Sequence, residues 1–438
     1  MKIVLQHLTK KFPARGPVRG RKNREDVIAV NDFDFEIPDG KLIGLLGPSG
    51  CGKSTALNLI CGLLKPTEGK IFFGEDDVTG LPPENRGVGM VFQNYALYPH
   101  LTVEKNIQFP LENLKGADKL SKEEMSKRVL EAAKLVQIDH LLERKPNELS
   151  GGQQQRVAIA RTLAPEPAVL FMDEPLSNLD AKLRLEMRYE LQRLHVETGS
   201  TFVYVTHDQM EAMTLATKIC LINNGVLQQY DAPLDVYNRP ANLFVADFVG
   251  NPSINFVEAK GKEQADGSFS FRILDDLEAT FRPNEPIDMA AWFAKRDKDA
   301  ADLEAQRIEM LKDKKAVEKS NKDEVFKYHI AKVDESDYAV EEEPEITNED
   351  FVLAIRPEAL KLSGDGAIAS TIYGAMPTGM ESTVKLRIGK YLLTGVIFGG
   401  VTFKLGEETG VDIAGTDILL FDRKSGKAIT AGSLAVKG

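Results

Sequence analysis

The stretch that decides the fold is GPSGCGKST, Gly47–Thr55. It matches GxxxxGK[ST], follows the apolar run KLIGLL directly and precedes ALNLICGLL, which has helical character. Glycines in such a loop let backbone N–H groups curl around phosphate oxygens, and the following helix N-terminus adds partial positive charge. Strand, loop and helix in this order predict a phosphate-binding site. Its expected residues are Gly47, Pro48, Ser49, Gly50, Cys51, Gly52, Lys53, Ser54 and Thr55.

Within this loop, two side chains have expected roles with a nucleoside triphosphate. Lys53 would reach the β- and γ-phosphates, and the Ser54 hydroxyl would ligate Mg²⁺. A chance glycine turn is the plain alternative, and both the flanking elements and a second motif argue against it.

That second motif is AVLFMDEP, where a predicted buried strand ends in two carboxylates. Open α/β sheets place ligands at the carboxyl ends of their strands, so Asp173 is expected to hold Mg²⁺. Glu174 is expected to polarise a water for attack on the γ-phosphate. Taken alone, two carboxylates at a solvated strand end would be unremarkable in a protein, but here they accompany a phosphate loop.

Two further side chains are expected at the same edge. TFVYVTHD brings His207 to the end of a neighbouring predicted strand, although a lone histidine at a strand end is more often structural. Gln93, in VFQNYALYPH, can ligate Mg²⁺ or orient water, and by itself it is uninformative. The expected catalytic set is thus Glu174, His207 and Gln93, and the expected metal ligands are Ser54, Gln93 and Asp173.

The organisation of the chain changes near residue 235. Up to there, apolar runs alternate with helical patterns, which predicts a mostly parallel sheet covered by helices and a helical subdomain at about 93–165. Within it, Ser121 and Glu124 have the spacing of a capping box. Residues 236–438 contain alternating runs such as STVKLRIGKYLLTGVIF and predict a smaller β-rich domain.

Two charged segments interrupt this plan. Residues of about 288–350 are rich in Lys, Asp and Glu with few apolar positions, which indicates a solvated helix, a hairpin or disorder. The basic cluster at 10–24 reads as a solvated loop between strands, with an anionic-lipid or nucleic-acid contact as the alternative.

Composition narrows the class of protein. The 438 residues carry a net charge of −11, which argues against a general nucleic-acid binder. No apolar run approaches the ~20 residues that span a bilayer. The three cysteines show no paired spacing, as is usual in a reducing cytoplasm. A cytoplasmic protein that binds no nucleic acid is expected.

One stretch is unexplained by these patterns. LSGGQQQR, Leu149–Arg156, places a serine and two glycines at the head of a good helix, although glycine is costly in helices. A helix start without side chains leaves its amides open to close approach by an anion.

Together these motifs resemble the ATP-binding subunit of an ABC transporter. GPSGCGKST, Gln93, LSGGQQQR, FMDEP, SNLD and THD occur in the family's order over the first ~235 residues. PLSNLDAKLRLEMR, THDQMEAMTLA and FVADFVGNPSINF are similar to the carbohydrate-importer subset, of maltose, multiple-sugar or glycerol-phosphate type. AIRPEALKL and LLFDRKSGKAI resemble its C-terminal regulatory β-barrel.

The resemblance implies an α/β P-loop NTPase domain of ABC type at 1–235. It also implies an OB/TOBE-like β-barrel regulatory domain at 236–438 that carries the charged insertion, since the chain is several dozen residues longer here than the family pattern. ATP is the implied substrate, and Mg²⁺ the implied cofactor.

The resemblance also answers the question raised by LSGGQQQR. In the family, two copies pack head to tail, and each ATP lies between the P-loop of one and the signature helix of the other. The implied residues that act in trans are Ser150, Gly151, Gly152, Gln153 and Asp180. Phe12 is implied to stack on adenine, although the basic loop after it exceeds the family's length.

The implied partners are a second copy or a close paralogue, two transmembrane permease subunits and, indirectly, a solute-binding protein. The implied location is the cytoplasmic face of the cell membrane. The segment after Gln93 matches the family's permease contact, whereas Tyr95, Leu97 and Tyr98 could equally be core of the helical block.

Domain content distinguishes an importer subunit from other ABC ATPases. Soluble ABC proteins of translation usually carry two ATPase cores, and those of DNA repair insert a coiled coil within the core. Neither feature is found here. Import of a polyamine, glycerol phosphate, sulfate or iron stays open, because the ATPase does not touch the cargo.

Overall fold

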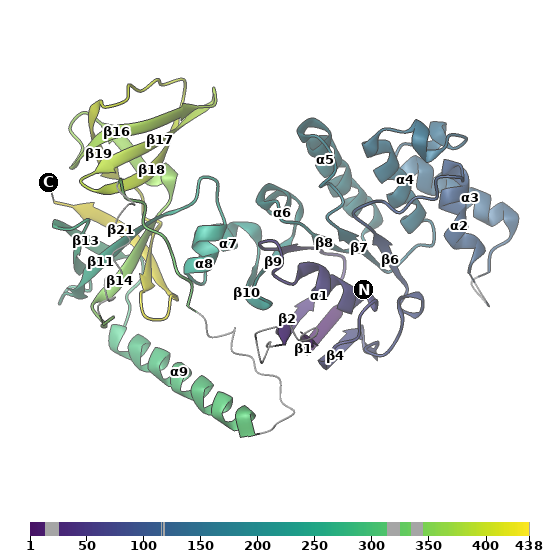
Figure 1. The fold of residues 1–438 in the computed structure, drawn as a ribbon, viewed down its shortest axis with the longest axis horizontal. Helices are drawn as coiled ribbons and strands as arrows, with labels where there is room; N and C mark the ends of the chain where they lie inside the picture. The colour runs from purple at the N-terminus through teal and green to yellow at the C-terminus, as the bar shows by residue number, and fades with distance from the viewer. Residues whose placement is uncertain (14–25, 115, 117–118, 313–324, 334–344, 438) are drawn as a thin grey trace, which may run out of the picture. The chain divides into compact units, whose positions relative to one another are not determined.

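The computed structural model describes residues 1–13, 26–114, 116, 119–312, 325–333 and 345–437. The chain forms two compact units, Met1–Pro233 (unit 1) and Leu234–Gly438 (unit 2) (Figure 1). Most of the basic cluster at 10–24 and part of the segment at 288–350 lie outside the described residues.

Unit 1 is built on a mostly parallel sheet in the strand order β10-β9-β3-β8-β7-β6. Four of these strands are fully or nearly fully buried, as expected for strands with helices on both faces. The chain reverses direction only between β9 and β10. The strands are β3 (Leu42–Leu46), β6 (Val88–Val91), β7 (Val169–Asp173), β8 (Thr201–Val205), β9 (Lys218–Asn223) and β10 (Val226–Asp231).

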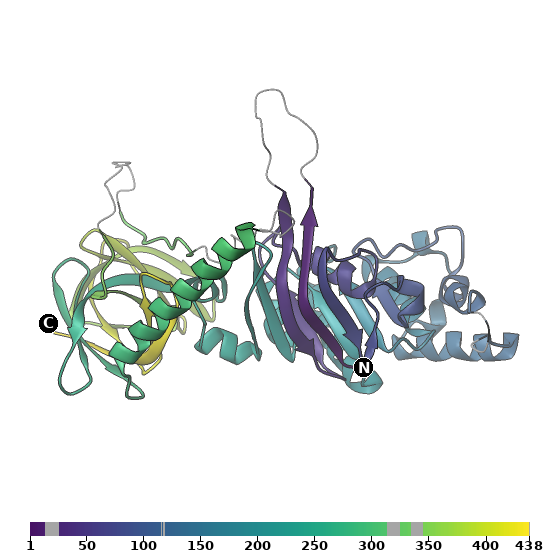
Figure 2. The same cartoon turned by 90° about the horizontal axis from the view of Figure 1, so that it is seen from below.

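A second, antiparallel sheet of unit 1 has the order β2-β1-β4-β5. Its long strands β1 and β2 run side by side, coloured purple in Figure 2. Together with the first sheet it encloses helix α1 in one hydrophobic cluster. The bounds are β1 (Ile3–Phe12), β2 (Val27–Ile37), β4 (Glu68–Phe73) and β5 (Asp76–Asp77).

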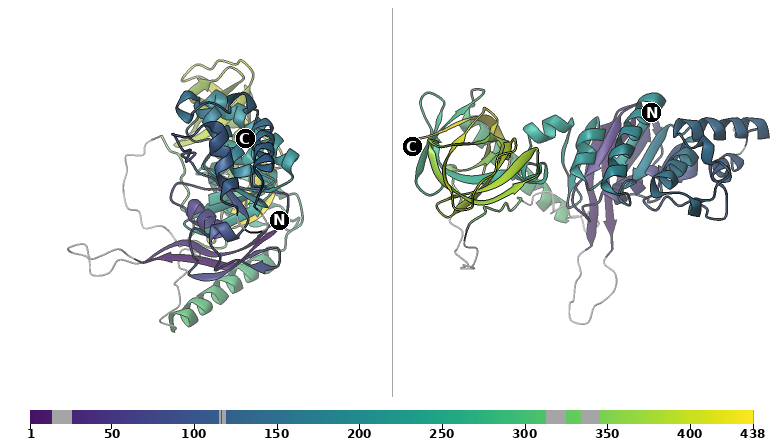
Figure 3. Two further views of the ribbon diagram at one scale, coloured as in Figure 1. Left: turned by 90° about the vertical axis from the view of Figure 1, so that its right-hand side faces the viewer. Right: turned by 90° about the horizontal axis from the view of Figure 1, so that it is seen from above.

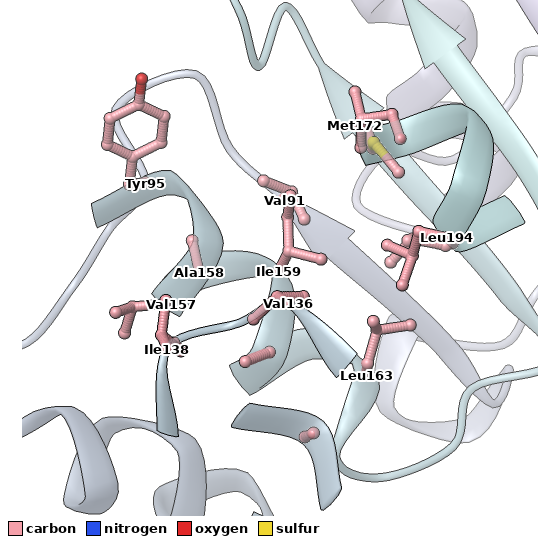
Figure 4. Close-up of a cluster of buried hydrophobic side chains, with 14 of the residues drawn as sticks. Val91, Tyr95, Val136, Ile138, Val157, Ala158, Ile159, Leu163, Met172 and Leu194 are labelled. Carbon is pink, nitrogen blue, oxygen red and sulfur yellow. The ribbon is translucent and has the colours of Figure 1, made fainter. Parts of the chain in front are cut away.

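Three helices of unit 1, α1, α3 and α4, lie where the sequence patterns predict helices. The expected capping box of α3 is present, because Ser121 and Glu124 exchange side chain to backbone hydrogen bonds. Helices α2, α3 and α4 pack together over a cluster that Figure 4 shows. The helices are α1 (Lys53–Cys61), α2 (Val103–Glu112), α3 (Lys122–Leu135), α4 (Gly151–Leu163), α5 (Ala181–Thr198) and α6 (Gln209–Leu215).

Of the three side chains weighed as core or permease contact, Tyr95 is buried and part of this cluster. Leu97 packs against the cluster as a partly buried side chain. The ring of Tyr98 lies 4.7 Å from that of Phe109. The core interpretation therefore holds for Tyr95.

Unit 2 contains a closed barrel in the order β11-β12-β13-β21-β20-β14, visible as a ring in Figure 3. A separate antiparallel sheet, β15-β19-β16-β17-β18, shares its hydrophobic cluster. The barrel strands are β11 (Asn255–Glu263), β12 (Phe269–Ile273), β13 (Leu277–Pro283), β14 (Asp350–Ile355), β20 (Ile418–Asp422) and β21 (Ala428–Val436). The remaining elements are α7 (Pro233–Asn238), α8 (Leu243–Phe248), β15 (Leu360–Ser363), β16 (Ile368–Pro377), β17 (Glu381–Ile388), β18 (Tyr391–Phe398) and β19 (Glu408–Ile413).

The charged segment begins with a long helix, α9 (Met289–Lys312). The expectation that this segment is solvated is wrong for the first turns of α9. Met289 and Arg296 are each 5% exposed, and Phe293 packs against the barrel cluster. Farther along, Leu303 and Ile308 are exposed, as expected. In the part of the chain that the structure describes, no helix combines the length and apolar character needed to cross a membrane.

Candidate nucleotide site

The phosphate loop is held in a conformation that only glycine adopts without strain. Gly47, Gly50 and Gly52 have φ values of 154°, 79° and 106°. A Cβ atom on Gly52 would lie 2.1 Å from the carbonyl oxygen of Ala29, and one on Gly47 would lie 2.2 Å from that of Ile222. The loop between β3 and α1 therefore depends on glycine for space as well as for dihedral angles.

Lys53 lies at the start of α1 and is only 5% exposed. Its ammonium group donates to the carbonyl oxygens of Gly47 and Pro48, each at 2.9 Å. The lysine therefore lies across the loop that precedes it. This places one positive charge at the mouth of a loop whose backbone suits an anion.

Ser54 and Asp173 meet although 119 residues separate them. The Ser54 hydroxyl donates to Asp173 Oδ1 at 3.1 Å, and so joins the first turn of α1 to the end of β7. Burial raises the pKa of Asp173, and neighbouring Glu174 raises it further, while the bond from Ser54 and the charge of Lys53 oppose the shift. The surroundings of this carboxylate therefore favour a compensating positive charge.

Glu174, Gln93 and His207 converge at the same edge of the sheet. Glu174 Oε2 lies 3.3 Å from Nδ1 of His207. The same oxygen accepts a long hydrogen bond, of 3.5 Å, from Gln93 Nε2. Gln93 Nε2 also donates to Ser177 Oγ at 3.2 Å. The backbone N–H of Glu174 donates to Val205 O, so its position follows from the β7–β8 pairing. Two side chains from different loops, Gln93 and His207, thus contact the Glu174 carboxylate.

The signature residues form a second group. Ser150 caps α4 and forms a capping box with Gln153. A Cβ on Gly152 would lie 2.9 Å from the Leu183 side chain, and one on Gly151 would lie 3.3 Å from that of Leu179. The start of α4 therefore packs closely against the region where α5 begins.

Asp180 belongs to this second group. Its carboxylate accepts a hydrogen bond from Leu183 N and caps α5, and Leu183 is the residue whose side chain packs against Gly152. Within the described residues, no hydrogen bond or ion pair connects the group to the phosphate loop of the same chain. The structure brings the phosphate, carboxylate and histidine residues together, and it keeps the signature residues and Asp180 apart as a separate group.

Phe12 ends β1 and its side chain is 38% exposed. The Lys10 ammonium lies 5.2 Å from the centre of its ring. The ring is accessible to a planar ligand, although most of the loop after it is outside the described residues.

The donor set at the Ser54–Asp173 pair fits Mg²⁺. A hydroxyl and a carboxylate oxygen 3.1 Å apart are hard oxygen ligands, which Mg²⁺ prefers. Among the residues that the structure describes, no cluster of three or more His, Cys, Asp or Glu could hold a metal without help. A magnesium ion bound here would therefore complete its shell with substrate phosphate oxygens and water, as it commonly does.

The sequence patterns assigned no role to two residues near the site. Ser177, within SNLD, accepts the hydrogen bond from Gln93. Glu211, four residues after His207, is only 4% exposed. Its signal was an acidic residue on a short helix next to a histidine, which is too common to be informative alone.

The fold and site define an α/β nucleotide-binding protein with a P-loop. The family model "ABC transporter" matches residues 30–177. The chain is 54% identical over 235 residues to the maltose/maltodextrin import ATP-binding protein of Salmonella typhimurium, covering 54% of this chain and 63% of that protein. It is 47% identical over 275 residues to the sn-glycerol-3-phosphate import ATP-binding protein of Yersinia pseudotuberculosis, covering 63% of this chain and 72% of that protein.

A third relative, the trehalose/maltose import ATP-binding protein of Thermococcus litoralis, is 49% identical over 260 residues, covering 57% of this chain and 69% of that protein. Among solved structures, the ATP-binding cassette MJ0796 in a dimeric post-hydrolysis state bound to ADP and Pi matches at 35% identity. The match has a TM-score of 0.45 and covers 53% of this chain and 98% of that one. The chain belongs to the family of ABC transporter ATP-binding proteins.

Proposed function

We propose that this protein is the ATP-hydrolysing subunit of an ABC importer that takes up carbohydrate. The chain spans 63% of the length of its maltose-import relatives from Salmonella, so activity, cargo and partners are inferred. The observation that carries the proposal is the convergence of Gln93, Glu174 and His207 beside the Ser54–Asp173 pair.

In the proposed reaction, ATP and water give ADP and phosphate. The loop Gly47–Thr55 binds the phosphates, with Lys53 contributing charge that stabilises the transition state. Glu174 accepts the proton of the attacking water. Gln93 orients that water, and His207, whose Nδ1 lies 3.3 Å from Glu174 Oε2, holds the carboxylate in place.

Ser54, Asp173 and Gln93 would hold Mg²⁺, which when bound neutralises charge on the phosphates. Phe12 would stack on the adenine.

The active assembly is proposed to be a head-to-tail dimer. Ser150, Gly151 and Gly152 start α4 as a separate group, and the amide-rich helix end suits an anion from outside the chain. Gln153 and Asp180 would join them in contacting ATP held by the partner's loop. Closure on ATP and opening after hydrolysis would then drive two permease subunits at the cytoplasmic face of the membrane, supplied by a solute-binding protein.

We further propose that 1–235 is the ATPase domain and that 236–438 is regulatory, with an insertion at about 288–350. Carbohydrate is the favoured cargo because several relatives are named for maltose or trehalose import. Glycerol phosphate is the second candidate, since the relative from Yersinia pseudotuberculosis is named for the import of sn-glycerol-3-phosphate.

Glu174→Gln tests the proposed chemistry. The variant keeps the size of the side chain but removes its basicity, so ATP hydrolysis should fall about 10²–10⁴-fold while ATP binding persists. Phosphate release and equilibrium nucleotide binding measure the two effects. Glu166→Gln, on an exposed carboxylate paired with Arg128, is the matched control. Normal turnover of Glu174→Gln would show that another group acts as the base.

A further inference from the structure

Glu211 is a buried carboxylate that the proposed chemistry does not use. It lies on α6, is 4% exposed, and its Oε2 accepts from the hydroxyls of Tyr204 at 2.8 Å and Thr206 at 2.7 Å. Burying a carboxylate costs free energy unless hydrogen bonds and opposite charge compensate. Because this burial costs free energy, we infer that the carboxylate fixes the geometry of the groups that it contacts.

Thr206 connects Glu211 to the proposed catalytic histidine, which is the next residue. Thr206 is 2% exposed, and its N–H donates to Leu45 O of β3 at 3.1 Å. Its hydroxyl donates to Glu211 and accepts from Asp208 N at 2.9 Å. The backbone on both sides of His207 is therefore fixed, and Glu211 receives the hydroxyl bond that completes the turn.

Arg184 on α5 connects the same carboxylate to the second group of residues. Its Nε lies 3.9 Å from Glu211 Oε1, and its Nη1 lies 3.5 Å from Asp208 Oδ2. Nη2 donates to Leu179 O at 3.1 Å, and the Arg184 N–H donates to Asp180 O. One guanidinium thus contacts the helix after His207 and the backbone just before α5.

We propose that Glu211 is a positioning residue for His207, and that the Arg184 guanidinium links Glu211 and Asp208 to the Leu179 carbonyl just before α5. The inference rests on the proposed function. The Glu211 carboxylate is buried among protein groups, so in the proposal it acts through Thr206 and not on the nucleotide. It holds Thr206, so the imidazole keeps its place beside Glu174, while the Arg184 guanidinium keeps the turn around His207 at a fixed spacing from the Leu179 carbonyl.

The first test is Glu211→Gln in the full chain, measured by phosphate release and nucleotide binding. The neutral amide loses the attraction to Arg184 and weakens the Thr206 bond. We expect kcat to fall about 10- to 100-fold, as for small displacements of reacting groups, with ATP affinity within about two-fold. Gln192→Ala is the control. Gln192 Nε2 donates to Thr214 O, so it also links α5 to α6 but takes no part in the contacts among Glu211, Thr206 and Arg184. The control should keep normal turnover, and wild-type kcat in Glu211→Gln would overturn the proposal.

A double-mutant cycle separates positioning from general damage. If Glu211 acts through His207, then Glu211→Gln added to His207→Ala should cause no further loss of single-turnover rate. A merely structural role would multiply the two losses and overturn the proposal. Absence of hydrolysis in the wild-type protein would instead refute the proposed function.

If Glu211→Gln does not fold, Thr206 carries the same test. Thr206→Val removes the hydroxyl at nearly constant volume and should lower kcat, and Thr206→Ser should restore it. Equal rates in Val and Ser variants would contradict the role of the hydroxyl bond.

Discussion

Two aspartates of the molecule, Asp173 half-buried and Asp422 fully buried, are compensated in different ways. Asp173 at the candidate site accepts a hydrogen bond from the neutral Ser54, lies beside Glu174, and has a raised pKa. Asp422 in unit 2 is fully buried, but it pairs with Arg296 at 2.9 Å and accepts from Ser425. The difference fits the proposed roles: the charge of Asp422 is neutralised within the chain, where it supports the fold, whereas the charge of Asp173 would be met by the proposed Mg²⁺.

The largest effect is expected from Lys53→Ala. Removal of the positive charge from the phosphate loop should lower ATP turnover by about 10³-fold, the scale for loss of a preorganised charge or donor. Lys70→Ala, which removes an exposed partner of Asp77, should have no effect. Near-normal phosphate release from Lys53→Ala would refute the assignment of the loop.

The next largest effect is expected on the stability of unit 2, through the partner of Asp422. Arg296→Ala leaves Asp422 buried without its cation, which should cost about 3–5 kcal/mol of stability. Chemical unfolding of the full protein should show a loss confined to the transition of unit 2. Arg423→Ala, at the more exposed pair with Glu258, should cost about 1 kcal/mol or less. Equal losses would show that α9 is not anchored by this pair.

The glycine loop should be sensitive to a single methyl group. Gly52→Ala places Cβ within 2.1 Å of a backbone oxygen at a φ of 106°, so the loop must move. ATP affinity should fall by about 10²-fold, since misplacing a site by about 1 Å has that scale of effect. Gly74→Ala, with φ of 62° and no neighbour within 4 Å, is the control for strain alone. Unchanged nucleotide binding in Gly52→Ala would contradict the steric argument.

The smallest effect is a gain in stability. Asp173 has a raised pKa in the folded protein, so its ionisation destabilises the fold as pH rises through that pKa. Asp173→Asn should therefore raise Tm at neutral pH while lowering turnover, and the gain should shrink in acid, where Asp173 is protonated. A lower Tm at neutral pH would contradict the view that this charge is kept for the site.

Much of unit 1 was predictable because its signals are local. The strand runs, the phosphate loop and the Ser121–Glu124 capping box each lie within a short window, and the structure confirms the capping box. The meeting of Ser54 with Asp173 followed from the rule that parallel strands bring their carboxyl ends to one edge. The roles assigned to these residues stay predictions.

The rest could not be predicted because its partners are distant and chemically ordinary. Arg296 and Asp422 are separated by 126 residues, and each looks like a solvated charge in its own segment. The docked start of α9 depends on Met289 and Phe293, which a charged composition conceals. Glu211 is informative only once its burial between Tyr204 and Thr206 is known.

The central claim is that each ATP is enclosed by two copies of the chain, and nucleotide occlusion tests it most directly. Glu174→Gln would be loaded with ATP and passed through gel filtration with light scattering. The account predicts ATP retained by a species with the mass of two chains. Adding Ser150→Arg should abolish retention while equilibrium ATP binding persists, because the obstructed surface faces the partner's nucleotide. Retention by a species of one chain's mass, or retention unaffected by Ser150→Arg, would contradict the account.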